Sequence, residues 1–205
     1  MPRAGLDPDV VVRRAGALVD AHGIDALTLA RLAGELGVAA PSLYKHVGGL
    51  DDLLDRMAVA ATAELAARLG AASRGRAGRR ALEAIAEEYR RFAREHPGTY
   101  PLTSRPRDTD AWTAVADDAL AAVAAALSGY GVGTGDVHPI RVVRSALHGF
   151  VDLERTGGFG LPASVDESFR HLVDALDTTL RSLGGRAGGP AEGGGQASES
   201  YTAST

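Results

Sequence analysis

The stretch that decides the fold runs from Thr28 to Leu54 and reads TLARLAGELGVAAPSLYKHVGGLDDLL. Its apolar residues recur every three or four positions over 28–36 and again over 42–47, which predicts two short helices. Thr28 can cap the first helix through its side-chain oxygen, and Gly37 can end it because glycine tolerates the left-handed backbone of a tight turn. Two such helices joined by a short turn form a helix-turn-helix.

The second short helix carries polar side chains where a fully packed helix would carry apolar ones. Its hydroxyl, phenol, ammonium and imidazole groups can each donate to a phosphate oxygen or read a base edge. No acidic residue lies between Ala39 and Val47, so nothing there repels a phosphate, and Lys45 is the only lysine in a chain whose other cations are arginines. We therefore predict a DNA-contacting surface that includes Ala40, Pro41, Ser42, Tyr44, Lys45 and His46.

Outside this stretch the chain repeats the helical spacing and shows no sustained alternation of the kind that strands require. The expected fold is all-α. Residues 1–56 are expected to form the helix-turn-helix domain, residues 57–183 a helical bundle, and residues 184–205 a disordered tail rich in Gly, Ala and Ser. A long helix that starts at Leu50 bridges the two domains. The other expected helices cover residues 9–22, 82–92, 112–127, 140–155 and 166–183.

Composition excludes several classes of protein. The 205 residues include no cysteine, which removes disulfides and thiolate metal sites and suits a reducing cytoplasm. No apolar run approaches the roughly 20 residues of a membrane span, and we expect no membrane partner. The four histidines of residues 96–171 lack metal-ligand spacing, and no acid–base pair, nucleophile motif or cofactor fingerprint is present. We expect neither an enzyme nor a cofactor nor a metal site.

At these residues the chain resembles the tetracycline-repressor family of bacterial transcriptional regulators. The matching residues are LT at 27–28, LA at 32–33, LGV at 36–38, PSLYKHV at 41–47 and DDLL at 51–54. Residues 96–102 (HPGTYPL), 145–162 (SALHGFVDLERTGGFGLP) and 165–180 (VDESFRHLVDALDTTL) resemble the family's WHG-type ligand-binding domain. The resemblance implies a three-helix DNA-binding domain, a ligand-binding bundle and a homodimer.

Carried over by residue, the resemblance implies phosphate contacts from Thr28, Ser42, Tyr44 and His46, and base contacts from Ala40, Pro41 and Lys45, with Arg31 reaching in from the preceding helix. One position departs from the family pattern: Leu50 stands where many members place a lysine that grips the DNA backbone. Residues 1–56 hold six basic and eight acidic side chains, so non-specific DNA affinity is expected to be modest. A helix-turn-helix adaptor that binds other proteins remains the alternative.

The implied mechanism is repression of transcription, released when a small molecule binds within the bundle. Two copies, paired through helices 140–155 and 166–183, would present their reading elements to successive major grooves of a near-palindromic operator, about 34–36 Å apart. The ligand itself, the operator and the regulated genes cannot be read from the sequence. Five aromatic residues and one histidine in the expected bundle are candidate pocket residues, although core packing is an alternative for each: Tyr89, Phe92, Tyr100, Trp112, Phe150 and His148.

Overall fold

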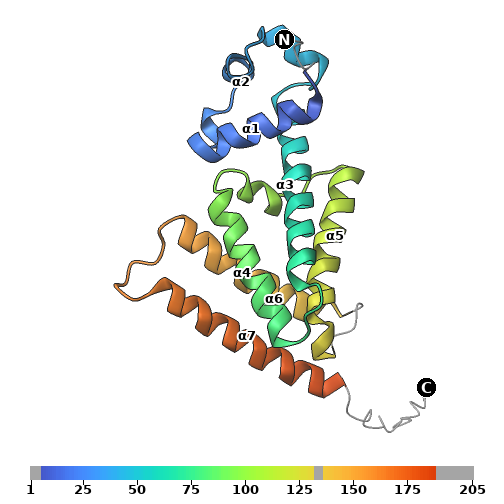
Figure 1. Ribbon diagram of the computed structural model, residues 1–205, viewed down its shortest axis with the longest axis vertical. Coiled ribbons are helices and arrows are strands. Elements are labelled where there is room, and N and C mark those ends of the chain that lie inside the picture. The colour runs from blue at the N-terminus through green and yellow to red at the C-terminus, as the bar shows by residue number, and fades with distance from the viewer. Residues whose placement is uncertain (1–5, 132–135, 188–205) are drawn as a thin grey trace, which may run out of the picture.

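The computed structural model describes residues 6–131 and 136–187, and every regular element in these ranges is helical (Figure 1). The prediction of an all-α fold is confirmed. The α-helices are α1 (Pro8–His22), α2 (Leu29–Leu36), α3 (Leu50–Ser73), α4 (Arg79–Glu95), α5 (Asp110–Leu127), α6 (Val137–Arg155) and α7 (Val165–Ala187). Short 3-10 helices are η1 (Ile24–Ala26), η2 (Ala40–Lys45), η3 (Tyr100–Ser104) and η4 (Ser128–Tyr130).

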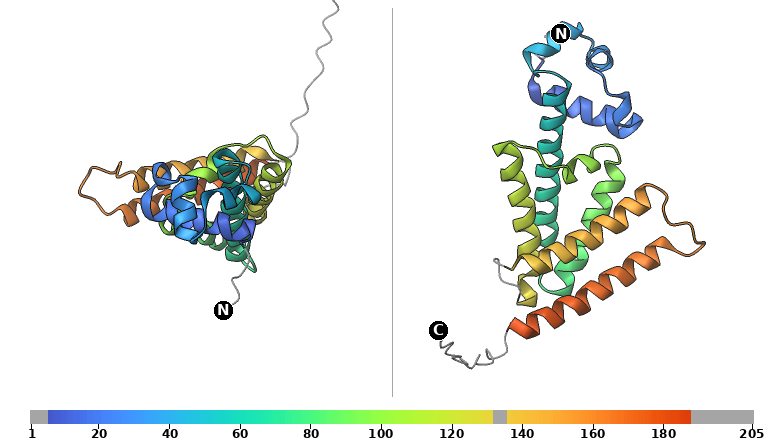
Figure 2. Two further views of the ribbon diagram at one scale, coloured as in Figure 1. Left: turned by 90° about the horizontal axis from the view of Figure 1, so that it is seen from above. Right: turned by 180° about the vertical axis from the view of Figure 1, so that it is seen from behind.

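The helices form two parts that share one long helix. α1, α2 and η2 gather around the start of α3 and form the head, at the top of Figure 1. The rest of α3 continues into the body, where it lies between α4 and α5. α6 and α7 run side by side across the far end of the body (Figure 2, right). The bridging helix expected from the sequence is therefore α3.

The helix starts follow the capping chemistry of the sequence. The Asp7 carboxylate accepts a hydrogen bond from the backbone N–H of Asp9 at 3.0 Å, directly before the proline that opens α1. The Thr28 side chain accepts from the N–H of Arg31 at 3.1 Å, as predicted for the cap of α2. Gly37 ends α2 in the left-handed conformation, with φ of 66°. These local signals position the turn on which the head depends.

Two apolar clusters hold the molecule together. The head cluster includes Leu32, Leu43 and Met57 but also Leu102 of η3 and Trp112 of α5. The body cluster draws on α3, α4, α5, α6 and α7. Because body residues complete the core of the head, the two parts pack directly against each other.

Three details differ from the sequence-based expectations. The second short helix, expected at 42–47, is the 3-10 helix η2. α7 continues to Ala187, so residues 184–187 are helical although they were assigned to the disordered tail; the rest of that tail lies outside the described residues. Residues 110–130, which include α5, are long and apolar enough to cross a membrane by length and composition, contrary to expectation. This is weak evidence for a span, because core helices of soluble proteins pass the same test.

Candidate nucleic-acid interface and ligand cavity

The helix-turn-helix is held from below by completely buried side chains. Leu32 of α2 and Leu43 of η2 are both 0% exposed, and Ala33 is buried where the two elements approach each other. The backbone N–H of Val38 donates to the carbonyl of Ala33 at 3.0 Å, which fixes the turn after Gly37. η2 is thus anchored through one apolar face, and its other side chains are left for the surface.

Each of the predicted DNA-contacting residues is accessible to solvent. Tyr44 is 61% exposed, an unusual position for a tyrosine that packs in a core. Of the other predicted contact residues, Thr28, Arg31, Pro41 and Lys45 are exposed and Ala40, Ser42 and His46 are half-buried. The fold therefore presents all of them on the α2–η2 unit, at the end of the molecule farthest from the carboxyl end of α7 (Figure 1).

Two of these residues already make local hydrogen bonds. The Thr28 oxygen accepts from the backbone of Arg31, which leaves the hydroxyl hydrogen of Thr28 able to donate to a phosphate. The backbone N–H of Ser42 donates to the carbonyl of Ala39 at 2.8 Å, so this amide is occupied within the turn. A phosphate contact from Ser42 would therefore come from its side-chain hydroxyl.

At the start of α3, the surface lacks the positive charge that a lysine in place of Leu50 would bring. Leu50 is 39% exposed and brings no charge to the position. The Asp52 carboxylate accepts from the backbone N–H of Gly48 at 2.7 Å and from Arg56 Nε at 3.0 Å, and these donors hold the pKa of Asp52 below its usual value. The Gly48 amide is thus already bound to a carboxylate, and the lost cation is not replaced there.

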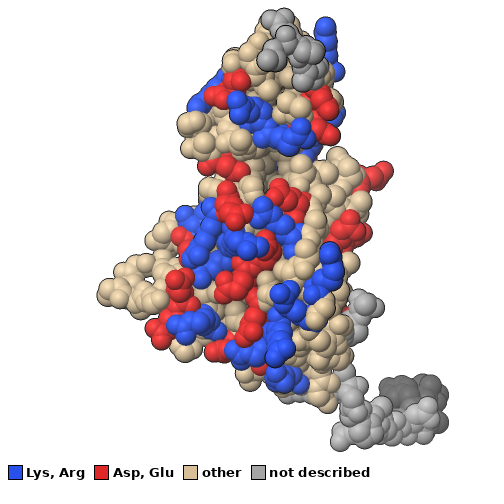
Figure 3. Space-filling view, viewed as in Figure 1, with Lys and Arg blue, Asp and Glu red and all other residues tan. Residues whose placement is uncertain are grey.

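The head carries charges of both signs. Figure 3 shows Lys or Arg side chains beside Asp or Glu side chains on the visible face of the head. Residues 1–56 have a net charge of −2, counting each acidic and basic side chain as one. Any attraction to nucleic acid must therefore come from a few placed groups, because the domain has no broad positive field.

The candidate pocket residues fall in different places. Trp112 is 7% exposed and lines a narrow cavity of ≈ 70 Å³ between α3, α4, η3, α5 and α6. Tyr100, which is 0% exposed, and His148 do not line this cavity but lie directly behind it, hydrogen-bonded to Tyr89, which does. Phe92 faces a separate cleft beside α1, together with His96 and Thr99. Tyr89, which the sequence also offered as a pocket candidate with core packing as the alternative, lines the cavity.

A chain of hydroxyl groups surrounds one ring nitrogen behind the cavity. Nδ1 of His148 lies 2.7 Å from the Tyr100 hydroxyl and 3.4 Å from both the Tyr89 and Ser104 hydroxyls. Burial is the largest cause that raises the pKa of both tyrosines, so both hydroxyls stay protonated, and the Tyr100 hydroxyl lies within donating distance of His148 Nδ1 and of the Tyr89 hydroxyl. His148 is therefore a half-buried, hydrogen-bonded histidine next to the cavity, and its contact with a ligand remains a prediction.

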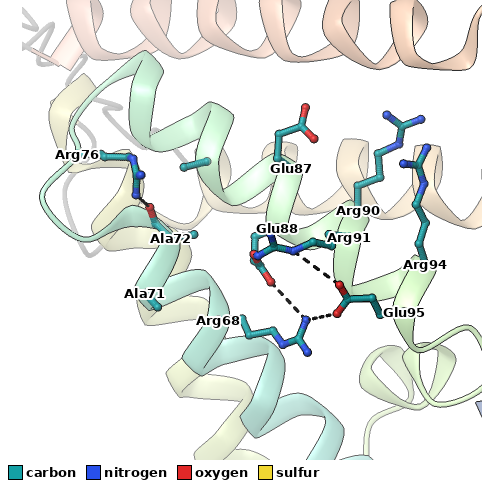
Figure 4. A pocket seen from close by; sticks show the side chains of 11 residues that line it. Arg68, Ala71, Ala72, Arg76, Glu87, Glu88, Arg90, Arg91, Arg94 and Glu95 are labelled. Atoms are coloured by element: carbon teal, nitrogen blue, oxygen red, sulfur yellow. Dashed lines mark hydrogen bonds and ion pairs between the residues drawn. The ribbon is translucent and has the colours of Figure 1, made fainter.

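A second and larger hollow, of ≈ 750 Å³, opens along α3 and α4 and is rich in arginine and glutamate (Figure 4). Most of its cations are paired with carboxylates: Arg68 lies 2.6 Å from Glu95, and Arg90 and Arg94 lie 2.6 and 2.7 Å from Glu154 of α6. Arg76 instead donates to the backbone carbonyl of Ala72. Arg90 is buried and its guanidinium stacks on the ring of Phe169 of α7. The network binds α4 to its neighbouring helices and leaves little unpaired charge for a ligand.

Besides the apolar core, a carboxylate joins the head to the body, that of Asp20 of α1. One of its oxygens accepts from the backbone N–H of Gly98 at 3.0 Å and of Thr99 at 2.8 Å, and the other lies 3.1 Å from Nδ1 of His96. Gly98 is pressed so closely against the backbone of Val19 that a side chain there would collide with it. This junction joins α1 to the loop that enters η3, and η3 lines the cavity.

Comparison with known proteins agrees with this geometry. Residues 82–176 match the family model described as tetracyclin repressor-like, C-terminal domain. The chain is 37% identical over 158 residues to the uncharacterized HTH-type transcriptional regulator Rv0681 of Mycobacterium tuberculosis, covering 75% of this chain and 72% of the relative. It is 30% identical over 184 residues to the uncharacterized HTH-type transcriptional regulator YobS of Bacillus subtilis, covering 89% and 93%. The chain belongs to the tetracycline-repressor family.

The fold of this regulator also has solved counterparts. One is a TetR variant of Acinetobacter baumannii in complex with minocycline, which aligns with a TM-score of 0.66 at 25% identity, over 87% of this chain and 98% of that one. The sequence-based predictions of a TetR-like DNA-binding transcriptional regulator and of a non-enzymatic protein are confirmed by the family. In the described residues, no group of three His, Asp or Glu side chains could hold a metal ion.

Proposed function

We propose that this regulator is a repressor that binds a near-palindromic operator through the α2–η2 units of two copies. The observation that carries the proposal is the placement of Tyr44 and Lys45, which directly follow the completely buried anchor Leu43 and are both exposed. Tyr44 and His46, with Thr28 and Ser42, are suited to phosphate contacts. Lys45, with Ala40, Pro41 and Arg31, is suited to the floor of the major groove.

The proposed dimer forms through α6 and α7. Seen from behind, these helices lie across the body with no other element in front of them (Figure 2, right). α6 exposes Val142 and Leu153, at 41% and 49%, on this part of the molecule. Exposed α7 residues with small side chains, such as Ala175 and Thr179, allow a second pair of helices to approach closely. A four-helix contact between two copies would cover both.

The proposed inducer is a small molecule that binds in the cavity beside Trp112. The A. baumannii relative is in complex with minocycline, which is a small molecule. Thr62 and Leu65 of α3 line the cavity, and the same helix begins in the head, so a ligand would act on the element that both parts share. Binding that favours one head orientation lowers operator affinity by the same factor by which the operator lowers ligand affinity. We place the protein in the cytoplasm, where its absence of cysteine suits a reducing environment.

The first experiment measures binding to the DNA upstream of the protein's own coding sequence by gel shift, with and without Lys45→Ala. Each base contact is worth about 1–3 kcal/mol, or about 5- to 150-fold in affinity, and a dimer loses two of them, so operator affinity should fall by at least about 30-fold. Arg80→Ala is the matched control, since it removes one exposed charge from α4 in the body. Equal effects of the two variants would contradict base reading, and the helix-turn-helix adaptor would become the better explanation.

The second experiment tests the dimer by sedimentation equilibrium. Leu153→Arg places a charge on the proposed contact surface and should convert the dimer to a monomer, with loss of operator binding. Leu120→Arg, at a position 37% exposed on α5, is the matched control and should remain dimeric. A wild-type monomer at operator-binding concentrations would contradict this part of the proposal.

A further inference from the structure

We infer that the cavity beside Trp112 takes a small organic acid: the carboxylate meets Arg144, the apolar body lies against Trp112 and the leucines of α3, and a polar substituent bonds the hydroxyl of Thr62. This inference rests on the proposed ligand response and names the chemical class of the ligand. Its support is the composition of the cavity wall, an unpaired buried hydroxyl and a cation at the mouth.

The wall of the cavity is mainly apolar. α3 contributes Leu65 and Leu69, and α5 contributes the ring of Trp112 with a row of small or aliphatic side chains, Ala116, Ala119, Leu120 and Val123. No acidic side chain is among the described residues that line it. Such a wall favours an apolar body and gives a cationic ligand no partner, because an unpaired charge in an apolar site is costly.

Thr62 is the buried polar side chain of the described cavity wall that has no hydrogen-bond partner within the described part of the chain. Its side chain is buried, the residue being 3% exposed, and its oxygen has no hydrogen-bond partner among the described residues. The neighbouring Thr103 also lines the cavity, but its hydroxyl donates to the carbonyl of Tyr100 at 2.7 Å. A buried hydroxyl without a partner destabilises the fold unless something bonds it, and here the open side is the cavity.

Arg144 of α6 is the one charged side chain among the described residues of the cavity wall, and it is exposed to solvent. The ion pairs that α6 makes in the described residues involve Asp152, Glu154 and Arg155, and not Arg144. Its guanidinium is close enough to Tyr89 to oppose the effect of burial on the pKa of that hydroxyl. A guanidinium without a carboxylate partner, beside an apolar cavity, fits the planar head of an organic acid.

The empty cavity, at ≈ 70 Å³, is close to the volume of two water molecules. A ligand with one ring or a short aliphatic chain must therefore separate α5 from α3. Trp112 belongs to the core cluster of the head, and Thr62 lies on the bridging helix, so this separation acts on two of the connections between the ligand site and the head. Ligand binding would thus move residues that also support the α2–η2 unit.

The test uses the only tryptophan of the chain, Trp112, as a fluorescent reporter in the full-length protein. The probes are benzoate, 1-naphthoate and decanoate, each compared with its neutral primary amide. The acids should quench or shift Trp112 fluorescence in a saturable way and bind about fivefold more tightly than the amides, the size expected of a solvent-exposed ion pair. Added salt should reduce this difference.

Two pairs of variants separate the roles of the residues. Arg144→Gln should abolish the preference for acids over amides, whereas Arg141→Gln, at an exposed α6 position outside the cavity wall, should leave it unchanged. Thr62→Val should raise the melting temperature of the free protein and weaken binding of 4-hydroxybenzoate, which carries a hydrogen-bonding substituent, about fivefold relative to benzoate. Thr103→Val should lower the melting temperature, because it breaks a bond already made.

Equal binding of acids and amides, or an acid preference that survives Arg144→Gln, overturns the inference. So does the absence of saturable quenching by all three acids. Release of operator DNA by a non-acidic compound would then leave the proposed repressor intact. Conversely, an Arg144-dependent acid preference in a protein that fails to bind operator would support this site and contradict the proposed function.

Discussion

The head and the body of this regulator are both helical, but their functional surfaces are built in different ways. The reading surface of the head comes from one continuous stretch in which Gly37 makes the turn and Leu43 anchors η2. The ligand cavity of the body is assembled from five elements, with Thr62 and Arg144 far apart in sequence. Residues close together in the sequence therefore specify the reading surface of the head, whereas tertiary packing specifies the cavity.

The largest expected effect tests whether the head is the more tightly specified part. Leu43→Ala removes a side chain that is 0% exposed and should lower the free energy of unfolding by about 2–5 kcal/mol. Leu120→Ala makes the same chemical change on α5, where the side chain is 37% exposed, and should cost within about 0.5 kcal/mol. Urea unfolding followed by circular dichroism measures both. Similar losses would mean that α5 is as firmly packed as η2.

The second prediction concerns the junction between the two parts. Asp20→Ala leaves the N–H groups of Gly98 and Thr99 without their acceptor and should cost about 2 kcal/mol of unfolding free energy. Hydrogen exchange should also become faster in α1, because its link to the body is lost. Asp25→Ala, at an exposed position in η1, is the matched control and should change neither quantity. An unchanged exchange rate in α1 would show that apolar packing alone joins the head to the body.

What the sequence could predict follows from the same comparison. Helix starts at Asp7 and Thr28, the turn at Gly37 and the exposed face of η2 depend on residues within a few positions of each other, and all lie where local rules place them. The contacts of these side chains with DNA remain a prediction. Trp112 could be named as a pocket candidate because an aromatic residue is conspicuous on a helix of alanines.

The residues that the sequence could not find have no local signal. Thr62 is one hydroxyl within a long helix, and only tertiary structure shows that its oxygen is buried without a partner. Asp20 reads as a solvated residue near the end of α1, yet it accepts bonds from a loop almost eighty positions away. Phe92 was grouped with Trp112 by its apolar spacing, but α4 turns its ring toward another cleft.

The third prediction compares one carboxylate from each part under acid conditions. Asp177 in the body accepts from the Tyr130 hydroxyl at 2.6 Å and from Arg181 at 3.0 Å, and the Arg181 bond is the largest cause that holds its pKa below the usual 3.8. The pKa of Asp52 in the head is also lowered, and its largest cause is the hydrogen bond from the Gly48 N–H. Each carboxylate stabilises the fold above its usual pKa, and this contribution is lost as the pH falls through the lowered value.

Asp177→Asn should therefore lower neutral-pH stability by about 1 kcal/mol and flatten the loss of stability below pH 3.8, measured by urea unfolding at a series of pH values. Asp52→Asn should flatten the same curve less, because its carboxylate is 37% exposed and screened by water. A larger effect of Asp52→Asn would show that the capping bond at the start of α3 outweighs a buried hydrogen-bond network.

The smallest expected effect returns to the position where the head departs from its family. Leu50→Lys places an ammonium beside the operator backbone and should tighten operator binding about two- to fivefold, since the new contact is exposed and the carboxylates of Asp51 and Asp52 compete for it. Each added phosphate contact should make the slope of log affinity against log salt concentration more negative by about 0.9, so a dimer should show about twice that change. Leu50→Gln removes the same apolar side chain without adding charge, and an equal gain from both variants would mean that the lysine makes no phosphate contact. A gain in operator affinity from Leu50→Lys alone would instead show that the missing cation weakens operator binding. It would also show that the head lies on DNA as in family members that carry this lysine.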